Sequence, residues 1–238
     1  ELTTSYLEGL AREVRAIDPD AHVHLNPHGV FGPVLCEYDF PSWRRFLDSF
    51  GGSAHPSWHF GLFPRDRFSV AMAATCSIVA SAAGPSSWMM TEVQGGTNTY
   101  SGARPICPTS REISQWLWII VGSGGRGAIF WSFNQRSSGF EAGEWGLISL
   151  LGGRTERLDA AAAVADCIAS HEAFFRDARP LESPVSVLYA RESLWVDRRL
   201  HKRYPDEPAG RALGAPLHSA LGWYEALSAS GLQPRLGE

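Results

Sequence analysis

The sequence lacks an excess of positive charge and lacks any long uninterrupted hydrophobic run. Its 21 Lys and Arg residues are outnumbered by 25 Asp and Glu residues, and its net charge at pH 7 is -4. A general nucleic-acid or anionic-membrane binder needs a basic surface, so these classes are excluded. The longest apolar runs have about ten residues, roughly half of what a helix needs to cross a bilayer. Since 44% of the residues are hydrophobic, we expect a soluble, cytoplasmic, globular protein.

Motifs for metal, disulfide, phosphate and serine-hydrolase chemistry are also missing. The four cysteines include no C-x-x-C pair, which disfavours a structural zinc site and a compact disulfide framework. His22, His24 and His28 lie close together, but no carboxylate or fourth ligand has a suitable spacing for a metal. The glycine-rich run 122–127 precedes a predicted strand instead of following one, so it is not a phosphate cradle. No G-x-S-x-G elbow is present, and we expect no cofactor.

What the sequence does contain is a regular alternation of helical and strand patterns. Helical spacing is found over residues 2–17, 41–50, 68–81, 110–122 and 158–178. Strand patterns are found over residues 22–27, 57–64, 87–93 and 127–133. This order predicts an α/β fold with a parallel sheet covered by helices. Because four parallel strands cannot close a barrel, the segment is either an open sheet or half of a (β/α)₈ barrel.

A change of pattern near residue 181 indicates a second domain. A new strand pattern covers 184–189, a new helical pattern covers 217–228, and a further strand pattern begins at Leu232. We therefore expect domains at residues 1–180 and 181–238, the second one truncated. The chain opens at Glu1 directly inside a helical pattern, which predicts that it is a piece of a longer protein.

Glu92 is the strongest candidate for a catalytic residue. It lies at the end of an apolar strand pattern, so a parallel sheet would present its carboxylate at the edge where active sites gather. A carboxylate at that position can attack the anomeric carbon of a sugar. The alternative from spacing alone is a structural ion pair with an arginine such as Arg104. Glu141 and Glu144 follow the fourth strand, and they either bind sugar hydroxyls or are solvated loop acids.

The segment 90–98 resembles the M-E-x-x-P-G-x-x-N segment of family 42 glycoside hydrolases, the β-galactosidases of clan A. Residues 115–118 and 127–133 resemble the helix and the eighth strand that follow the family's nucleophile. Asn26 matches the end of barrel strand five, Phe63-Pro64 resembles the Y-P end of strand six, and 139–141 resembles the G-x-E sugar-binding loop. Residues 184–231 resemble the start of the family's flavodoxin-like second domain.

This resemblance implies a retaining hydrolase of β-galactosides or related β-glycosides. The chain would carry strands five to eight of a (β/α)₈ TIM barrel, with Glu92 as the nucleophile on strand seven. The partner acid/base glutamate would end strand four, before residue 1, so the fragment alone would be inactive. The implied substrate-binding residues are Asn26, Gln94, Tyr100, Glu141, Glu144 and Trp145. No metal or other cofactor is implied, and the full-length protein would be a homotrimer, as is common in the family.

Several positions depart from the family pattern. Tyr100 stands where the family has tryptophan, Glu144 where it has histidine, and Gly95 where it has proline. A carboxylate can accept hydrogen bonds from sugar hydroxyls, but it cannot donate them as a histidine can. Glucosides and mannosides are therefore alternatives to galactosides. The alternative from another class is a non-catalytic carbohydrate-binding or structural protein that keeps the glycosidase barrel.

Overall fold

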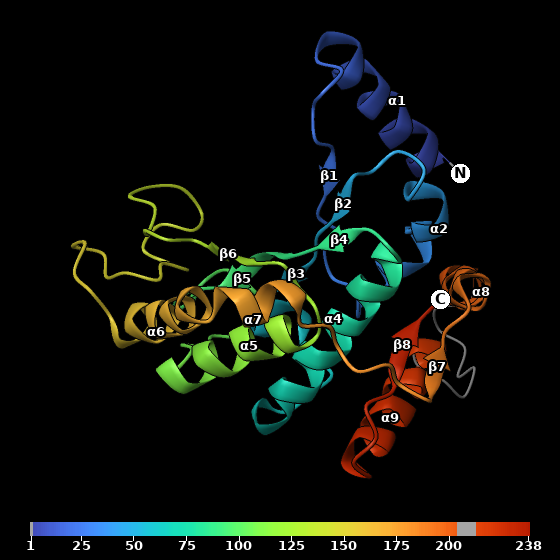
Figure 1. Ribbon diagram of the computed structural model, residues 1–238. Coiled ribbons are helices and arrows are strands. Elements are labelled where there is room, and N and C mark those ends of the chain that lie inside the picture. Colours follow the sequence, from blue (N-terminus) through green and yellow to red (C-terminus); the bar gives the residue numbers. More distant parts are fainter. Residues whose placement is uncertain (1, 204–212) are drawn as a thin grey trace.

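The computed structural model describes residues 2–203 and 213–238 as an α/β fold with parallel strand pairs. One sheet has the order β1 (His24–Leu25), β2 (Ser49–Phe50), β4 (Ser87–Trp88). A second sheet has the order β3 (Ser53–Ala54), β5 (Met90–Gln94), β6 (Ala128–Trp131). Because β2 leads into β3 and β4 into β5, the two sheets lie end to end (Figure 1). Neighbours in sequence are thus neighbours in the sheet, as in the predicted parallel arrangement.

Two glycines separate β2 from β3 because the neighbouring side chains leave no room for a Cβ atom. A Cβ on Gly51 would lie 2.3 Å from Thr91 Oγ1 and 2.4 Å from His24 Nε2. A Cβ on Gly52 would lie 2.6 Å from Val79 Cγ2. Glycine in a strand often marks such a close approach. The absence of a side chain at these two positions therefore lets the run from β2 to β3 pack closely against its neighbours.

Long helices connect the strands and supply most of the core. Helix α4 (Phe68–Ala83) follows β3, and α5 (Ser110–Gly122) follows β5. After β6 come α6 (Glu156–Ser170) and α7 (Glu172–Asp177). Helix α4 is apolar on most sides, and Met72 and Cys76 on it are fully buried. Helix α5 begins at a capping box formed by Thr109 and Glu112, and it buries Trp116 completely.

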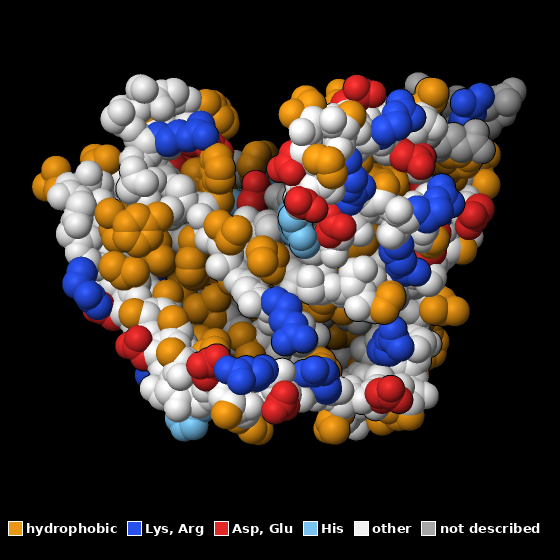
Figure 2. Space-filling model, turned by 45° about the horizontal axis from the view of Figure 1, so that its top comes forward, with side chains coloured by type: hydrophobic (Ala, Val, Ile, Leu, Met, Phe, Trp, Pro, Cys, Tyr) orange, Lys and Arg blue, Asp and Glu red, His pale blue; other side chains and the backbone are white. Residues whose placement is uncertain are grey.

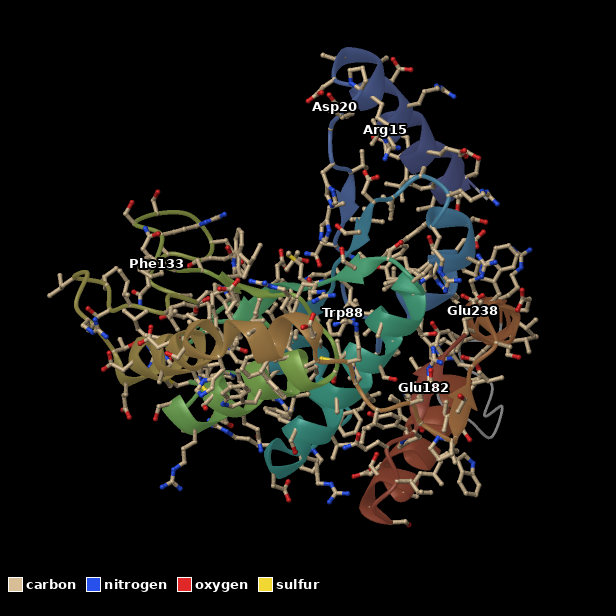
Figure 3. All side chains as sticks on the ribbon, viewed as in Figure 1. Arg15, Asp20, Trp88, Phe133, Glu182 and Glu238 are labelled. Carbon is tan, nitrogen blue, oxygen red and sulfur yellow. The ribbon has the colours of Figure 1, made fainter. Side chains whose placement is uncertain are left out.

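Helix α1 (Leu2–Ile17) lies at the amino-terminal edge of the first sheet, beside α2 (Phe40–Trp43). The indole nitrogen of Trp43 donates to Thr4 Oγ1 at 3.0 Å. Arg15, labelled in Figure 3, forms a 2.7 Å ion pair with Asp48. Asp48 Oδ2 also accepts a 2.7 Å hydrogen bond from the Val23 amide. These contacts fix α1 beside β1 and β2.

The carboxyl-terminal residues form a smaller α/β unit on the other side of α4 (Figure 1). It contains β7 (Ser186–Leu188), α8 (Arg191–Arg203), α9 (Ala215–Ala229) and β8 (Arg235–Gly237). The amide of Leu236 donates to Ser77 Oγ of α4 at 2.7 Å, and the Leu236 side chain is fully buried. Arg191 of α8 lies 3.5 Å from Asp39 and 3.2 Å from Glu238. Glu182 lies on the connection into this unit (Figure 3).

Two sequence predictions of local structure are wrong. Residues 41–50 are helical only in α2, because Asp48 is bound to Val23 and the next residues enter the sheet as β2. Residues 57–64 are not a strand: Pro56 opens the short helix α3 (Pro56–His59), and a turn follows. The second strand lies earlier, in the polar and glycine-interrupted run 49–54.

The other predicted elements agree with the structure or differ in detail. The limits of α1 and α5 are those expected from their helical spacing. The predicted helix 158–178 is two helices, α6 and α7, because the chain leaves the helical conformation at His171. Helix α8 was not predicted. The short 3₁₀ helices Pro33–Glu37 and Arg65–Arg67 complete the described elements.

None of the helices in the described part of the chain is both long enough and apolar enough to cross a membrane.

Candidate active site

Glu92 lies on β5, between β3 and β6, close to the end of the strand. Parallel strands bring their carboxyl ends to one edge of a sheet, and catalytic groups gather at that edge in α/β enzymes. The residues that follow β1 and β3 reach the same place, as their contacts with Glu92 demonstrate. The Glu92 side chain is 27% exposed, so a ligand can reach it. Figure 2 shows a hollow between two lobes on one face of the molecule, with acidic and histidine side chains beside it.

Three side chains contact one oxygen of the Glu92 carboxylate. The Ser53 hydroxyl donates to Oε2 at 2.8 Å. The Nε2 atoms of His55 and His28 lie 3.5 Å and 4.0 Å from the same oxygen. Arg104, the alternative ionic partner expected from spacing, instead donates to the carbonyl oxygens of residues 60 and 63. Glu92 is therefore held by neutral or weakly basic groups instead of a guanidinium.

These contacts keep Glu92 ionised. The hydrogen bond from His55 is the largest cause of a fall in its pKa to about 2, and it outweighs the effect of burial, which raises the pKa. The Ser53 hydrogen bond lowers the pKa further. A nucleophile must be a carboxylate, whereas a general acid needs a raised pKa. The environment of Glu92 therefore suits the nucleophile and not the proton donor.

Asn26, predicted from the sequence to bind substrate, extends this network. Its Oδ1 atom lies 3.2 Å from Ser53 Oγ. A hydroxyl has one proton to donate, and a carboxylate can only accept, so we assign the Ser53 proton to Glu92. Asn26 would then donate to Ser53 through its amide nitrogen, after the rotation that exchanges the two amide positions. Asn26, Ser53 and Glu92 form a chain of hydrogen bonds across three neighbouring strands.

An aromatic cluster surrounds the three partners of Glu92. The rings of His28 and His59 meet edge to face, with centroids 4.3 Å apart, and His28 also lies against Trp58 at 5.4 Å. Trp58 stacks on Trp145 at 6.2 Å with an interplanar angle of 14°. Trp58 is 44% exposed, whereas Trp145 is 1% exposed. A partly exposed indole in the cluster around a carboxylate offers an apolar surface to a sugar ring.

Trp145 and Glu141 lie on the loop after β6, and the structure gives them different surroundings. Trp145 has a φ of 66° and packs its ring edge to face against His55 at 5.2 Å. The Trp145 ring therefore packs against the cluster as a buried residue and is not accessible to solvent. Glu141 forms a 3.4 Å ion pair with Arg136, and its side chain is 17% exposed.

Gln94 was expected to bind substrate, but its amide group is fully used inside the protein. It is completely buried. Its Oε1 atom accepts from the Ser57 amide at 3.1 Å, and its Nε2 atom donates to the carbonyl oxygens of Gly96 and Ile106 at 3.0 and 3.2 Å. In this conformation Gln94 offers no group to a ligand. It joins α3 to the loop that follows β5.

Of the two other residues expected to bind substrate, Glu144 is buried and Tyr100 is exposed. Glu144 is 3% exposed and accepts hydrogen bonds from the amides of Thr99, Tyr100 and Ser101 and from the Ser101 hydroxyl. Burial raises the pKa of Glu144, but these hydrogen bonds together lower it below its ordinary value. Glu144 therefore stabilises the loop as a buried carboxylate. The Tyr100 residue is 82% exposed at the tip of that loop.

Sequence reasoning missed Ser53, His55, His59 and Trp58. Trp58 and His59 lie in the run 57–64, which was predicted as a strand, and Ser53 and His55 lie before it, where no element was predicted. Phe63-Pro64, expected at the end of a strand, lies in the turn after α3. The signal available was the i, i+4 spacing of His55 and His59, which places both rings on one side of a single helical turn.

The predicted pair His22 and His24 does not join the site. Both rings contact Ser49 Oγ at 2.8 Å, away from Glu92. Within residues 2–203 and 213–238, no group of three or more His, Cys, Asp or Glu side chains is arranged to hold a metal ion. A cavity of about 680 Å³ lies between α5, α6 and β6 and is lined mainly by apolar side chains. Glu92 is not among its lining residues, so the candidate site is assigned from the contacts of Glu92 and not from this cavity.

The arrangement defines a parallel α/β fold with an ionised carboxylate at the carboxyl edge of its sheet. No protein-family model and no curated protein sequence matches the chain. Solved structures do match, and several of them are β-galactosidases. That of Marinomonas ef1 aligns with 99% of this chain at a TM-score of 0.79 and 16% identity. That of Halorubrum lacusprofundi aligns with 99% at 0.77 and 19% identity. A catalytic mutant of Gan42B, a GH42 β-galactosidase from G. stearothermophilus, aligns with 99% at 0.74 and 13% identity.

The resemblance to family 42 β-galactosidases inferred from sequence is thus confirmed at the level of the fold. The chain covers 36%, 34% and 33% of those three chains, so it spans about a third of their length. Identities this low establish the shared fold, and the activity has to be argued from the site.

Proposed function

We propose that this chain is part of a retaining β-glycosidase of the family 42 type, acting on β-galactosides or related β-glycosides. Residues 1–180 would form strands five to eight of a (β/α)₈ barrel, and 181–238 would begin a flavodoxin-like domain. The order β1, β2–β3, β4–β5, β6, with parallel neighbours, supports the first assignment. The parallel pair β7–β8 with α9 between its strands supports the second.

The observation that carries the proposal is the state and position of Glu92. It is a carboxylate with a pKa of about 2, partly exposed at the carboxyl edge of the sheet, and its neighbour His28 packs against the partly exposed Trp58. In a retaining glycosidase such a group attacks the anomeric carbon while a second carboxyl group, about 5 Å away, protonates the leaving oxygen. We assign that second group to the part of the protein before residue 1, and the chain alone would then lack activity.

The test uses the full-length protein and nitrophenyl β-glycosides of galactose, glucose and mannose. Glu92→Gln should lower kcat/KM by roughly 10³-fold or more, because the nucleophile is lost. Glu92→Gly supplied with azide should form a glycosyl azide of inverted anomeric configuration, since azide takes the place of the missing carboxylate. The sugar preferred by the wild type identifies the substrate among the three.

The alternative function, non-catalytic carbohydrate binding, is separated by the same experiment. The buried roles of Gln94 and Glu144 favour the structural form of this alternative, a protein that keeps the glycosidase barrel without turnover, because two expected sugar ligands are used internally. Sugar binding by calorimetry without turnover of any of the three glycosides would support it and would contradict the proposed hydrolase.

A further inference from the structure

The contacts of Glu92 are unequal between its two oxygens. Ser53 Oγ, His55 Nε2 and His28 Nε2 all approach Oε2, at 2.8, 3.5 and 4.0 Å. The contact recorded for each imidazole is to Oε2, and Oε1 accepts no hydrogen bond within the described residues. One oxygen is therefore anchored and the other is left to a ligand.

His55 is built into the protein in a way that directs it at this carboxylate. Its side chain is 3% exposed. Neither of its ring nitrogens makes a hydrogen bond of ordinary geometry within the described part of the chain, and Nε2 lies 3.5 Å from Glu92 Oε2. Its ring is fixed edge to face against Trp145 and His59, with centroids 5.2 and 5.6 Å away. Because a carboxylate can only accept, the tautomer that fits carries its proton on Nε2 and donates to Glu92.

We propose that His55 is a positioning residue which, together with Ser53, anchors Oε2 of Glu92 so that Oε1 is the attacking oxygen. This inference rests on the proposed glycosidase function. The 3.5 Å contact is long for a hydrogen bond, and such bonds tighten when substrate is bound. The role of His55 is to orient the nucleophile and keep it ionised, and it makes no bond to substrate.

The same contacts suit the covalent step. Oε1 forms a bond to the anomeric carbon while the bond from that carbon to the leaving oxygen breaks and takes its electron pair with the leaving group. A nitrophenyl leaving group departs as the phenolate and needs no proton. Oε2 becomes the carbonyl oxygen of the ester and still accepts from Ser53 and His55. The anchor is thus retained from the free carboxylate to the glycosyl ester.

The other titratable groups facing Glu92 are His28, in the loop after β1, and His59 on α3. Burial is the main cause that lowers the pKa of His59, to about 3, so this ring is neutral at ordinary pH. Burial is also the main cause that lowers the pKa of His28, although Glu92 opposes it. His28 is half-exposed and 4.0 Å away, so it contributes less to the anchor than His55.

The experiment compares His55→Phe, His55→Gln, Ser53→Ala and the control His171→Phe in the full-length protein. The His171 ring lies between α6 and α7 and contacts the carbonyl of residue 167. The first readout is the pH dependence of kcat/KM for a nitrophenyl β-glycoside that the wild type hydrolyses. The second is the titration of the Glu92 carboxyl carbon by NMR with ¹³C-labelled glutamate, assigned by its loss in Glu92→Gln.

His55→Phe should raise the titration midpoint of Glu92 and the acid limb of kcat/KM by about one to two pH units, because a hydrogen bond to a charged group is lost. The factor by which kcat falls in His55→Phe should be larger than the factor by which KM changes. His55→Gln keeps an N–H donor and should titrate close to the wild type. Ser53→Ala should shift the midpoint in the same direction as His55→Phe, and His171→Phe should leave it unchanged.

Wild-type titration of Glu92 in His55→Phe would overturn the positioning role, even if the azide experiment identifies Glu92 as the nucleophile. Failure of the azide experiment would instead overturn the proposed function and the role of His55 with it. If His55→Phe does not fold, the decision falls to Ser53→Ala and His55→Gln. The anchor is contradicted if the midpoint in Ser53→Ala is unshifted or that in His55→Gln rises by a full unit.

Discussion

Glu92 differs from an ordinary surface glutamate because its ionised form is stabilised in the folded state. Its pKa falls from 4.5 to about 2, mainly through His55. A depressed carboxyl pKa gives stability that is present above the unfolded pKa and is lost as the pH falls through the folded one. The contribution of Glu92 to the free energy of unfolding should therefore decline between about pH 5 and pH 2.

This decline can be measured by comparing wild type with Glu92→Gln, which cannot titrate. Urea denaturation at pH 5 and at pH 3 should show a larger loss of stability for the wild type than for the variant. Other carboxylates with lowered pKa, such as Asp48 and Glu112, are common to both proteins and cancel in the difference. Equal losses in the two proteins would contradict the stabilising contacts at Glu92.

Glu144 is a second residue whose surroundings decide its role. Its carboxylate accepts three consecutive backbone amides and a hydroxyl while buried. In Glu144→Gln one acceptor oxygen becomes an NH₂ group facing other donors, which should cost about 1–3 kcal/mol. Glu141→Gln, at a partly exposed ion pair, should cost less than about 1 kcal/mol. Equal unfolding free energies for the two variants in denaturant titrations would contradict this assignment.

The strand that carries Ser53 depends on two glycines, and this gives a prediction for the whole element. Gly51→Ala would place a methyl group 2.3–2.4 Å from the side chains of Thr91 and His24, so strands β1, β2 and β5 would have to separate. We expect the free energy of unfolding to fall by about 1–3 kcal/mol, as in other overpacked cores. In Gly61→Ala the added Cβ meets nothing within 4 Å. Thermal unfolding should separate the two variants clearly, and similar melting temperatures would rule out the close approach.

The same element explains what sequence could and could not predict. Glu92 was identifiable because it ends an apolar strand, and Asn26 because a proline and a polar residue end β1. Ser53 and His55 were missed because their strand is short, polar and interrupted by glycines, with no alternating apolar pattern. The aromatic residues of the run 57–64 were interpreted as a strand. In the structure Trp58 lies on α3 and packs against His28 and Trp145.

At the scale of the whole molecule, α4 lies between the first sheet and the carboxyl-terminal unit. Leu236 of β8 is fully buried there, and its amide is bound to Ser77. Leu236→Ala should destabilise the protein by roughly 2–5 kcal/mol through the cavity it creates. Leu232→Ala, at a residue that is 38% exposed, should cost much less. A Leu236→Ala protein as resistant to limited proteolysis and denaturant as Leu232→Ala would show that the two units are not packed through α4.

The buried amide of Gln94 has one further effect, on how the segments that carry Trp58 and Tyr100 can move. It holds the first turn of α3, where Trp58 is located, to the backbone on either side of the exposed Tyr100. The two aromatic rings are consequently carried by segments fastened to a common point. Displacement of one of these segments should therefore displace the other with it, so we expect Trp58 and Tyr100 to move together.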